Sequence, residues 1–189
     1  MSQESRPVRT RKSFVALAIS FAVIVGLVGS LALNLIESRS EDDAGKLRGE
    51  IAMSAPELEG LVKKKNLEIY WAGPRAGYSY TVDTSNKGTH LLRYIKLNAK
   101  PSDVVSNSRV IATYKSKSAF ADSIAAAERP ENTGFRNPDG SVVFYQTAKK
   151  TSVYLAFPKK KVQIEIYDPI VGQALSLAIL QDQITKVGQ

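Results

Sequence analysis

The chain has 189 residues, of which 43% are hydrophobic, with no cysteine and a formal net charge of +8. This hydrophobic fraction excludes a disordered chain, and the absence of cysteine excludes disulfides, thiolate nucleophiles, zinc–thiolate sites and iron–sulfur clusters. The length predicts one domain with an appendage, and the charge is compatible with an anionic partner without requiring one.

The appendage is an apolar segment near the N-terminus. Residues 14–33 read FVALAISFAVIVGLVGSLAL, and no charged residue occurs between Ser13 and Ile36. As a helix rising about 1.5 Å per residue, this run would span roughly 30 Å, which is the thickness of the hydrocarbon core of a bilayer. We therefore predict a basic cytoplasmic tail over residues 1–12 and a transmembrane helix over residues 13–36.

The charges that flank this segment predict its orientation. Basic residues precede it and acidic residues follow it: Arg6, Arg9, Arg11 and Lys12, then Glu37, Glu41, Asp42 and Asp43. Because positive charge resists translocation, we expect a single-pass protein of the plasma membrane with its N-terminus inside and its C-terminal part outside the cytoplasm. A cleaved signal peptide is the alternative, since Ser30-Leu31-Ala32 fits a small-x-small cleavage site. The apolar run is longer than the roughly 7–15 residues of a secretory core, which favours an uncleaved anchor.

An acidic connector follows the apolar segment. Between Glu37 and Glu59, seven acidic residues against three basic ones give a charge of −4, whereas from Gly60 onward nineteen basic residues against ten acidic ones give +9. We predict a stalk over residues 37–54, either flexible or continuing the membrane helix, and an extracytoplasmic domain over residues 55–189.

This domain has the pattern of an α+β fold. Helices are predicted over Ala55–Lys65 and Ser118–Arg129, and from Asp168, as N-cap before Pro169, to about Thr185. Period-two alternation and β-rich runs predict seven strands: Leu67–Ala72, Tyr78–Thr84, His90–Leu97, Arg109–Lys115, Ser141–Thr147, Ser152–Phe157 and Val162–Tyr167. Residues 134–140 read as a loop. Since strands joined by short turns cannot be parallel, we expect an antiparallel sheet of about seven strands with the helices packed on one face.

The stretch IYWAGPRAGYSY, residues 69–80, holds the only tryptophan of the chain. Its glycines and proline predict a turn between two strands, so one interpretation is a hairpin whose aromatic rings form a small core. The other is a cleft lined by Trp71, Arg75 and Tyr78 that binds a ring-bearing or sugar ligand. Aromatic rings fit a sheet surface covered by a helix, which favours the first interpretation.

Lysines cluster at three places: residues 63–65, Lys149 with Lys150, and Lys159 to Lys161. The last two clusters fall in hairpin turns and would form one cationic patch if those turns lie at the same end of the sheet. Such a patch could bind anionic lipid head groups or phosphate-rich wall polymers. The favoured alternative is that the lysines keep turns solvated and sheet edges from aggregating. Nucleic acid is not an expected partner in this compartment.

The side chains that carry catalytic chemistry are few. His90 is the only histidine, no GxSxG motif supplies a nucleophilic serine, and no phosphate loop or dinucleotide fingerprint occurs. We therefore expect no catalytic residue, no metal site and no cofactor. Two hypotheses remain: an anchored, non-catalytic domain that binds an envelope protein, polymer or lipid, and an envelope hydrolase or transferase that uses His90 and nearby carboxylates.

Four stretches resemble a family of uncharacterised, single-pass envelope proteins of actinobacteria with a small exported domain: IYWAGPRAGYSYTV, LRYIKL, VIATYKSKSAFADSI and SVYLAFPKKKVQIEIYDP. The resemblance covers most of residues 67–180, and the block from Tyr70 to Tyr80 is its most distinctive part. It implies a location in the cell envelope and a membrane-anchored architecture. No activity is assigned to that family, so it implies no functional residues.

Overall fold

The computed structural model describes residues 51–99, 107–180 and 183–189. The contacts of the chain divide it into two units, Met1–Ser38 and Arg39–Gln189, and all the described residues belong to the second. The predicted basic tail, the transmembrane segment and most of the stalk therefore lie outside the described residues. Among the described helices, none is long and apolar enough to span a bilayer.

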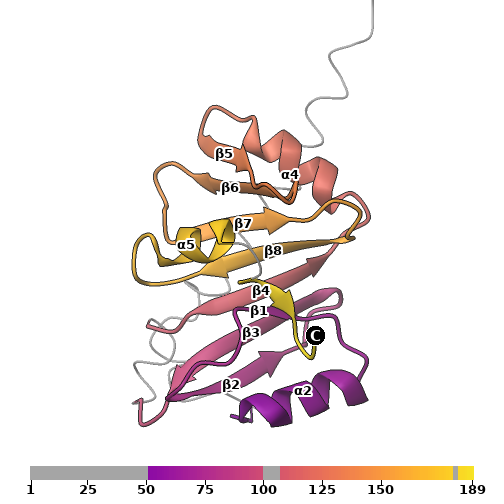
Figure 1. Cartoon of the computed structure of the whole chain (residues 1–189), viewed down its shortest axis with the longest axis vertical. Helices are drawn as coiled ribbons and strands as arrows, with labels where there is room; N and C mark the ends of the chain where they lie inside the picture. The colour runs from indigo at the N-terminus through magenta and orange to yellow at the C-terminus, as the bar shows by residue number, and fades with distance from the viewer. Residues whose placement is uncertain (1–50, 100–106, 181–182) are drawn as a thin grey trace, which may run out of the picture. The chain divides into compact units, whose positions relative to one another are not determined.

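Seven antiparallel strands form the main sheet, in the order β2-β3-β4-β8-β7-β6-β5 (Figure 1). Their bounds are Tyr78–Asp83 for β2, Thr89–Lys96 for β3, Val110–Lys115 for β4, Asn132–Arg136 for β5, Val142–Gln146 for β6, Ser152–Ala156 for β7 and Val162–Tyr167 for β8. The β2–β3–β4 half and the β5–β8 half meet where β4 pairs with β8. The predicted α+β class and the antiparallel sheet of about seven strands are confirmed.

Two predictions about the main sheet are wrong. The stretch from Leu67 to Ala72 does not join the main sheet, because its short strand β1 (Tyr70–Trp71) pairs instead with β9 (Thr185–Lys186) in a separate two-stranded sheet. Conversely, the predicted loop over residues 134–140 overlaps β5, the edge strand. Residues such as Gly134 are typical of turns, so the sequence pattern did not indicate this strand. A Cβ atom at Gly134 would lie 2.4 Å from the Cβ of Ala127, so the glycine is needed for close helix–strand packing.

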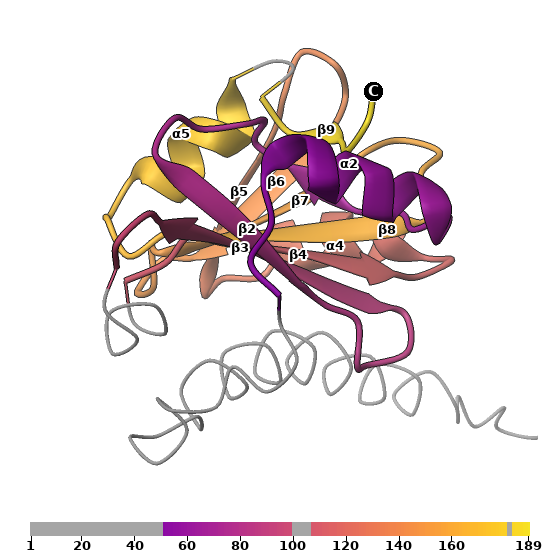
Figure 2. The same cartoon turned by 90° about the horizontal axis from the view of Figure 1, so that it is seen from below.

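The three described helices lie on both faces of the sheet, which corrects the prediction that they share one face. They are α2 (Ala55–Lys64), α4 (Ala119–Ala127) and α5 (Gln173–Ile179). On β8, Ile164 belongs to the same core cluster as Ala178 of α5, whereas Gln163 points the other way and donates a hydrogen bond of 2.9 Å to Ser123 Oγ in α4. Figure 2 shows α2, α5 and β9 on one side of the sheet and α4 on the other. The α4 face of β8 carries the polar side chains of Gln163 and Glu165, so the alternation of this strand indicated a solvent-exposed face and did not reveal the second layer.

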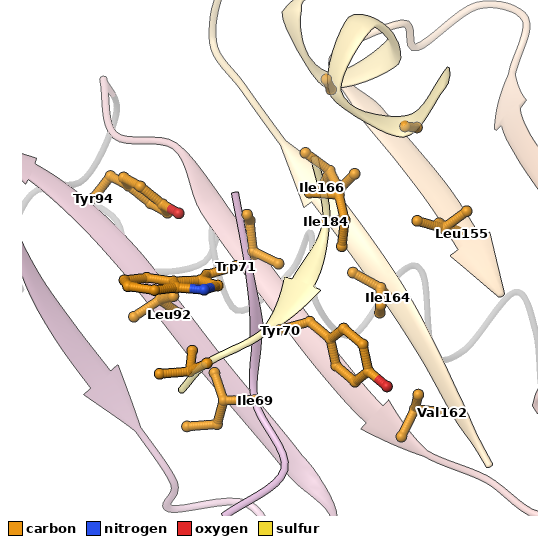
Figure 3. Packing of buried hydrophobic residues seen from close by; sticks show 14 of the residues in the cluster. Ile69, Tyr70, Trp71, Leu92, Tyr94, Leu155, Val162, Ile164, Ile166 and Ile184 are labelled. Atoms are coloured by element: carbon orange, nitrogen blue, oxygen red, sulfur yellow. The ribbon is translucent and has the colours of Figure 1, made fainter. Parts of the chain in front are cut away.

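The core of the domain lies between the sheet and the layer formed by α2, α5, β1 and β9. Figure 3 shows Trp71 beside Leu92, and Tyr70 beside Ile164, both rings projecting from β1 toward the sheet. The backbone N–H of Tyr70 also donates to Thr113 Oγ1 of β4, at 3.1 Å. The two-residue strand β1 is therefore held against the middle of the sheet by packing and by a buried hydrogen bond.

The ends of the helices follow local capping chemistry. As predicted, α2 begins after Ser54, whose backbone N–H and hydroxyl both donate to the Glu57 carboxylate in a capping box. The last helix is much shorter than predicted. Asp168 is not its N-cap; the N-cap is Gly172, with φ of 88°. The Asp168 carboxylate instead accepts from the N–H of Ile170, which turns the chain two residues before the helix.

Candidate functional site

The rings of the IYWAGPRAGYSY stretch form an aromatic cluster in the core. Trp71 is only 4% exposed and contacts Tyr80 edge-to-face at 5.9 Å between ring centroids. Tyr80 in turn contacts Tyr94 of β3 edge-to-face at 5.1 Å. The small aromatic core is therefore present, but it is built between layers and not within a hairpin, because β1 pairs with β9 and not with β2.

The loop between β1 and β2 is fixed by the hydroxyl groups of these buried tyrosines. Tyr94 Oη accepts from the N–H of Ala72 at 2.8 Å and donates to the carbonyl of Gly73 at 3.1 Å, and Tyr80 Oη accepts from the N–H of Arg75 at 2.7 Å. The exposed Arg75 guanidinium lies 4.4 Å from the centroid of the Tyr78 ring. Of the predicted cleft residues, Arg75 and Tyr78 thus meet at the surface, whereas Trp71 lies beneath them in the core.

The two predicted lysine turns lie at opposite ends of the sheet. Lys149 and Lys150 lie between β6 and β7, and Lys159 to Lys161 lie between β7 and β8. Successive hairpin turns of an antiparallel sheet alternate between its two ends. The β7–β8 turn is drawn at the right of Figure 1 and the β6–β7 turn at the left. The two clusters therefore do not form one patch.

The β7–β8 turn is instead joined by two neighbouring turns that also carry lysines. The N–H of Ser116 donates to the carbonyl of Lys161 at 2.9 Å, and the N–H of Lys115 donates to the carbonyl of Gly88 at 2.8 Å. We call the resulting surface the lysine-rich end, defined by Lys87, Lys115, Lys117, Lys159, Lys160 and Lys161. All six side chains are exposed. Sequence analysis missed the first three because β3, β4 and β8, which are distant along the chain, bring them together.

Positive charge dominates this end. Three carboxylates of the described residues lie nearby. Asp83 accepts from the N–H of Ser85 at 2.8 Å and Asp122 from the hydroxyl of Ser118 at 2.6 Å, and Glu68 acts on the pKa of His90, as Lys115 does. The ion pair between Arg109 and Asp168 is at the other end of the strands. The C-terminal end of α2, with its own lysines at residues 63–65, lies toward the lysine-rich end in both views (Figures 1 and 2).

Lys159 occupies a backbone conformation that suits glycine better. Its φ is 62°, and the N–H of Lys160 donates to the carbonyl of Phe157 at 3.3 Å across the turn. Pro158 and Lys159 are the two central residues of this turn, and a positive φ at the second of them favours Gly or Asn. A lysine there costs on the order of 1 kcal/mol relative to glycine, so Lys159 lowers the stability of the folded domain.

His90 is not arranged as a catalytic base. Its side chain is 8% exposed, and among the described residues its Nδ1 has no hydrogen-bond partner. Burial, and secondly the Lys115 ammonium, lower the pKa of His90. The buried carboxylate of Glu165 belongs to the opposite face of the sheet, and Asp168 is at the opposite end. The Glu68 carboxylate is near enough to act on the pKa of His90 in the raising direction, but its influence is the smallest of those that act there. The described residues also contain no group of three His, Asp or Glu side chains close enough to hold a metal ion.

Glu165 is a buried acid that sequence analysis missed. It is 2% exposed on the α4 face of β8, where it accepts from Tyr114 Oη at 2.7 Å and from Tyr154 Oη at 3.3 Å. Burial raises the pKa of Glu165, while the hydroxyls of Tyr114, Ser152 and Tyr154 act in the opposite direction. The alternation of VQIEIY placed this residue on a face that was expected to be solvent-exposed.

Comparisons with known proteins add no relative. No protein family matches the chain, and neither curated proteins nor solved structures give a significant match.

Proposed function

We propose that the chain is a membrane-anchored, extracytoplasmic and non-catalytic protein whose domain binds an anionic polymer of the cell envelope through its lysine-rich end. The observation that carries this proposal is the convergence of six exposed lysines on three hydrogen-bonded turns, with no ion pair to any of them among the described residues. The anchor is the apolar run of residues 14–33, which would hold the N-terminus in the cytoplasm and the domain outside.

The chemistry of the lysine-rich end favours a polymer over a bilayer as its partner. Ammonium groups on adjacent turns attract a chain of phosphates or carboxylates at long range, and salt weakens this attraction. A surface that enters a bilayer also needs exposed apolar side chains. None of the exposed large hydrophobic side chains of the described residues lies on these three turns.

The test compares two triple variants that lose the same charge. In the first, Lys159, Lys160 and Lys161 are replaced by Gln; in the control, Lys96, Lys149 and Lys150 at the opposite end are replaced. We expect the first variant to bind fluorescent linear polyphosphate at least about tenfold more weakly at low salt, and the control to remain within about threefold of the unmodified chain. Fluorescence anisotropy measures both affinities. An equal loss in the two variants would contradict a localised site.

A single substitution separates binding from stability at the same turn. Lys159→Gly relieves the positive φ and should raise the free energy of unfolding by about 0.5–1 kcal/mol, while the lost ammonium lowers the affinity for polyphosphate. Urea unfolding and anisotropy should therefore move in opposite directions. A variant that is more stable and binds equally well would argue that Lys159 takes no part in binding.

A further inference from the structure

The end of the sheet opposite the lysine-rich end carries exposed aliphatic side chains on two loop tips. Leu97 directly follows β3, and Ile170 and Val171 follow β8; these side chains are 54%, 64% and 68% exposed. β4 lies between β3 and β8 and is antiparallel to both. The C-terminal ends of β3 and β8 are therefore at the same end of the sheet, measured along the strands. The connection after β8 is drawn at the left of Figure 1.

Hydrogen bonds to the backbone hold these tips in place. The N–H of Leu97 donates to the carbonyl of Gly77 at 2.9 Å. The N–H of Ile170 donates to Asp168 Oδ1 at 2.9 Å, and the carbonyl of Ile170 accepts from the N–H of Gln173 at 3.1 Å. The aliphatic side chains are thus presented outward by anchored turns.

Cationic side chains flank the aliphatic ones. Lys96 directly precedes Leu97, and the turn that carries Lys149 and Lys150 is bound to the β8 tip, because the N–H of Asp168 donates to the carbonyl of Thr151 at 3.0 Å. The Asp168 carboxylate, which would oppose them, is paired with Arg109 at 2.8 Å. Two exposed acids, Glu128 and Glu131, lie on the connection between α4 and β5, and the carbonyl of Glu131 accepts from the N–H of Thr147 at 3.1 Å beside this turn.

Bulky aliphatic side chains bordered by lysines match the interface of an anionic bilayer. The aliphatic groups gain by entering the acyl boundary, and the ammonium groups gain by meeting negative head groups; together these two signals give a contact that neither gives alone. A tether raises the local concentration of the membrane, so that a weak contact becomes populated. Residues 37–50 can extend over at most about 50 Å at roughly 3.5 Å per residue, which lets this end of the sheet reach the bilayer.

We infer that Leu97, Ile170 and Val171 rest in the interface of an anionic phospholipid bilayer, with Lys96, Lys149 and Lys150 at its head groups. This inference rests on the proposed membrane anchoring of the chain. In this arrangement one end of the strands contacts the bilayer. The lysine-rich end, at the other end of the strands, faces away from the bilayer toward the polymer.

The chain contains no cysteine, so one introduced cysteine carries a label at a single site. The full chain with Val171→Cys is labelled with an environment-sensitive NBD fluorophore and reconstituted into vesicles of 70% phosphatidylcholine and 30% phosphatidylglycerol. Ser85→Cys, in an exposed turn of the lysine-rich end, is the matched control. We expect doxyl-labelled lipid to quench the label at position 171 at least twofold more than the label at 85. Adding Lys149→Gln and Lys150→Gln should reduce that difference. Equal quenching at the two positions would overturn the inference.

Two further readings separate the possible causes of failure. Alkaline carbonate extraction of the same vesicles tests the anchor alone. A chain that resists extraction while its label at 171 stays unquenched disproves the bilayer contact but supports the anchor. A chain whose label is quenched before extraction but which is then removed by carbonate supports the bilayer contact and disproves the anchor. A label at 171 shielded from aqueous iodide but not quenched by lipid, with shielding that grows with protein density, would assign this surface to a second copy and overturn the inference.

Discussion

At the scale of single residues, the Glu165 carboxyl is buried within the sheet. It is enclosed between β4 and β7 and hydrogen-bonded by tyrosine hydroxyls from both strands. Burying a carboxylate is costly, so the folded state favours the neutral acid. The unfolded chain, in which the pKa returns to its ordinary value of 4.5, does not. Folding stability therefore depends on pH through this residue.

The sign of this dependence gives a prediction. Stability contributed by the raised pKa of Glu165 is fully present below pH 4.5 and is lost as the pH rises toward the folded-state pKa, by up to about 1.4 kcal/mol per pH unit. Between pH 5 and pH 8, the free energy of unfolding should fall more for the unmodified domain than for Glu165→Gln, which stays neutral. Urea unfolding of a fragment that begins at Arg39 measures both. His90 titrates in both proteins, so its contribution cancels. A constant difference between the two proteins would contradict the prediction.

Residue-scale features also mark the limit of what the sequence could predict about the site. Lys159 to Lys161 stand out as a run, but Lys87, Lys115 and Lys117 are isolated in sequence. Their proximity depends on which strands pair, and no local pattern reports that β4 lies next to β8. Arg75 and Tyr78 are close in sequence and were predicted to lie together, but the hydroxyl of Tyr94, which helps to fix their loop, comes from another strand and was not predictable.

At the scale of elements, period-two strands and the first helix were predictable, whereas the layers and the start of the last helix were not. The alternation in β2 is a local signal, and both β2 and α2 occur where expected. The contact between α4 and β5 shows how packing can oppose such signals. The small side chains of α4, among them Ala126 and Ala127, allow the helix to pack closely on the edge strand β5, whose glycine resembles a loop residue. The glycine that allows this close packing therefore hindered the prediction of the strand, and the face of the sheet that α4 covers was not predicted either.

This packing predicts opposite effects for two glycine substitutions. Gly134→Ala places a methyl group 2.4 Å from the Cβ of Ala127 and should destabilise the domain by about 2 kcal/mol or more, because backbone must move. Gly60→Ala in α2 meets nothing within 4 Å and should stabilise it by about 0.5–1 kcal/mol through helix propensity. Thermal or urea unfolding of the fragment from Arg39 compares them. If Gly134→Ala were neutral, α4 would not pack on β5 as described.

At the scale of the whole molecule, the first and last described strands complete one layer of the core. The pairing of β1 with β9 lets the chain return over the sheet after α5, and the N–H of Val187 donates to the carbonyl of Ile69 at 2.9 Å. Ile184 and Val187 are buried in the same cluster as Trp71. The layer that covers the aromatic core thus depends on residues more than a hundred positions apart.

Ending the chain after Ile184 tests this closure. We expect the loss of β9 and of the buried Val187 side chain to lower the free energy of unfolding by about 2–4 kcal/mol. Trp71 should then become more exposed, which would shift its fluorescence to longer wavelength. Because Trp71 is the only tryptophan, the emission reports this layer alone. Unchanged emission together with unchanged stability would show that β9 is dispensable.

The direction of the strands has a mechanical consequence. If one end of the sheet holds a polymer and the other lies on a bilayer, tension between them acts along the strands. The ladder hydrogen bonds of an antiparallel sheet run perpendicular to the strands, so such a load shears many of them at once and does not open them one after another like a zipper. The domain would resist pulling most strongly along the axis on which its two surfaces are set.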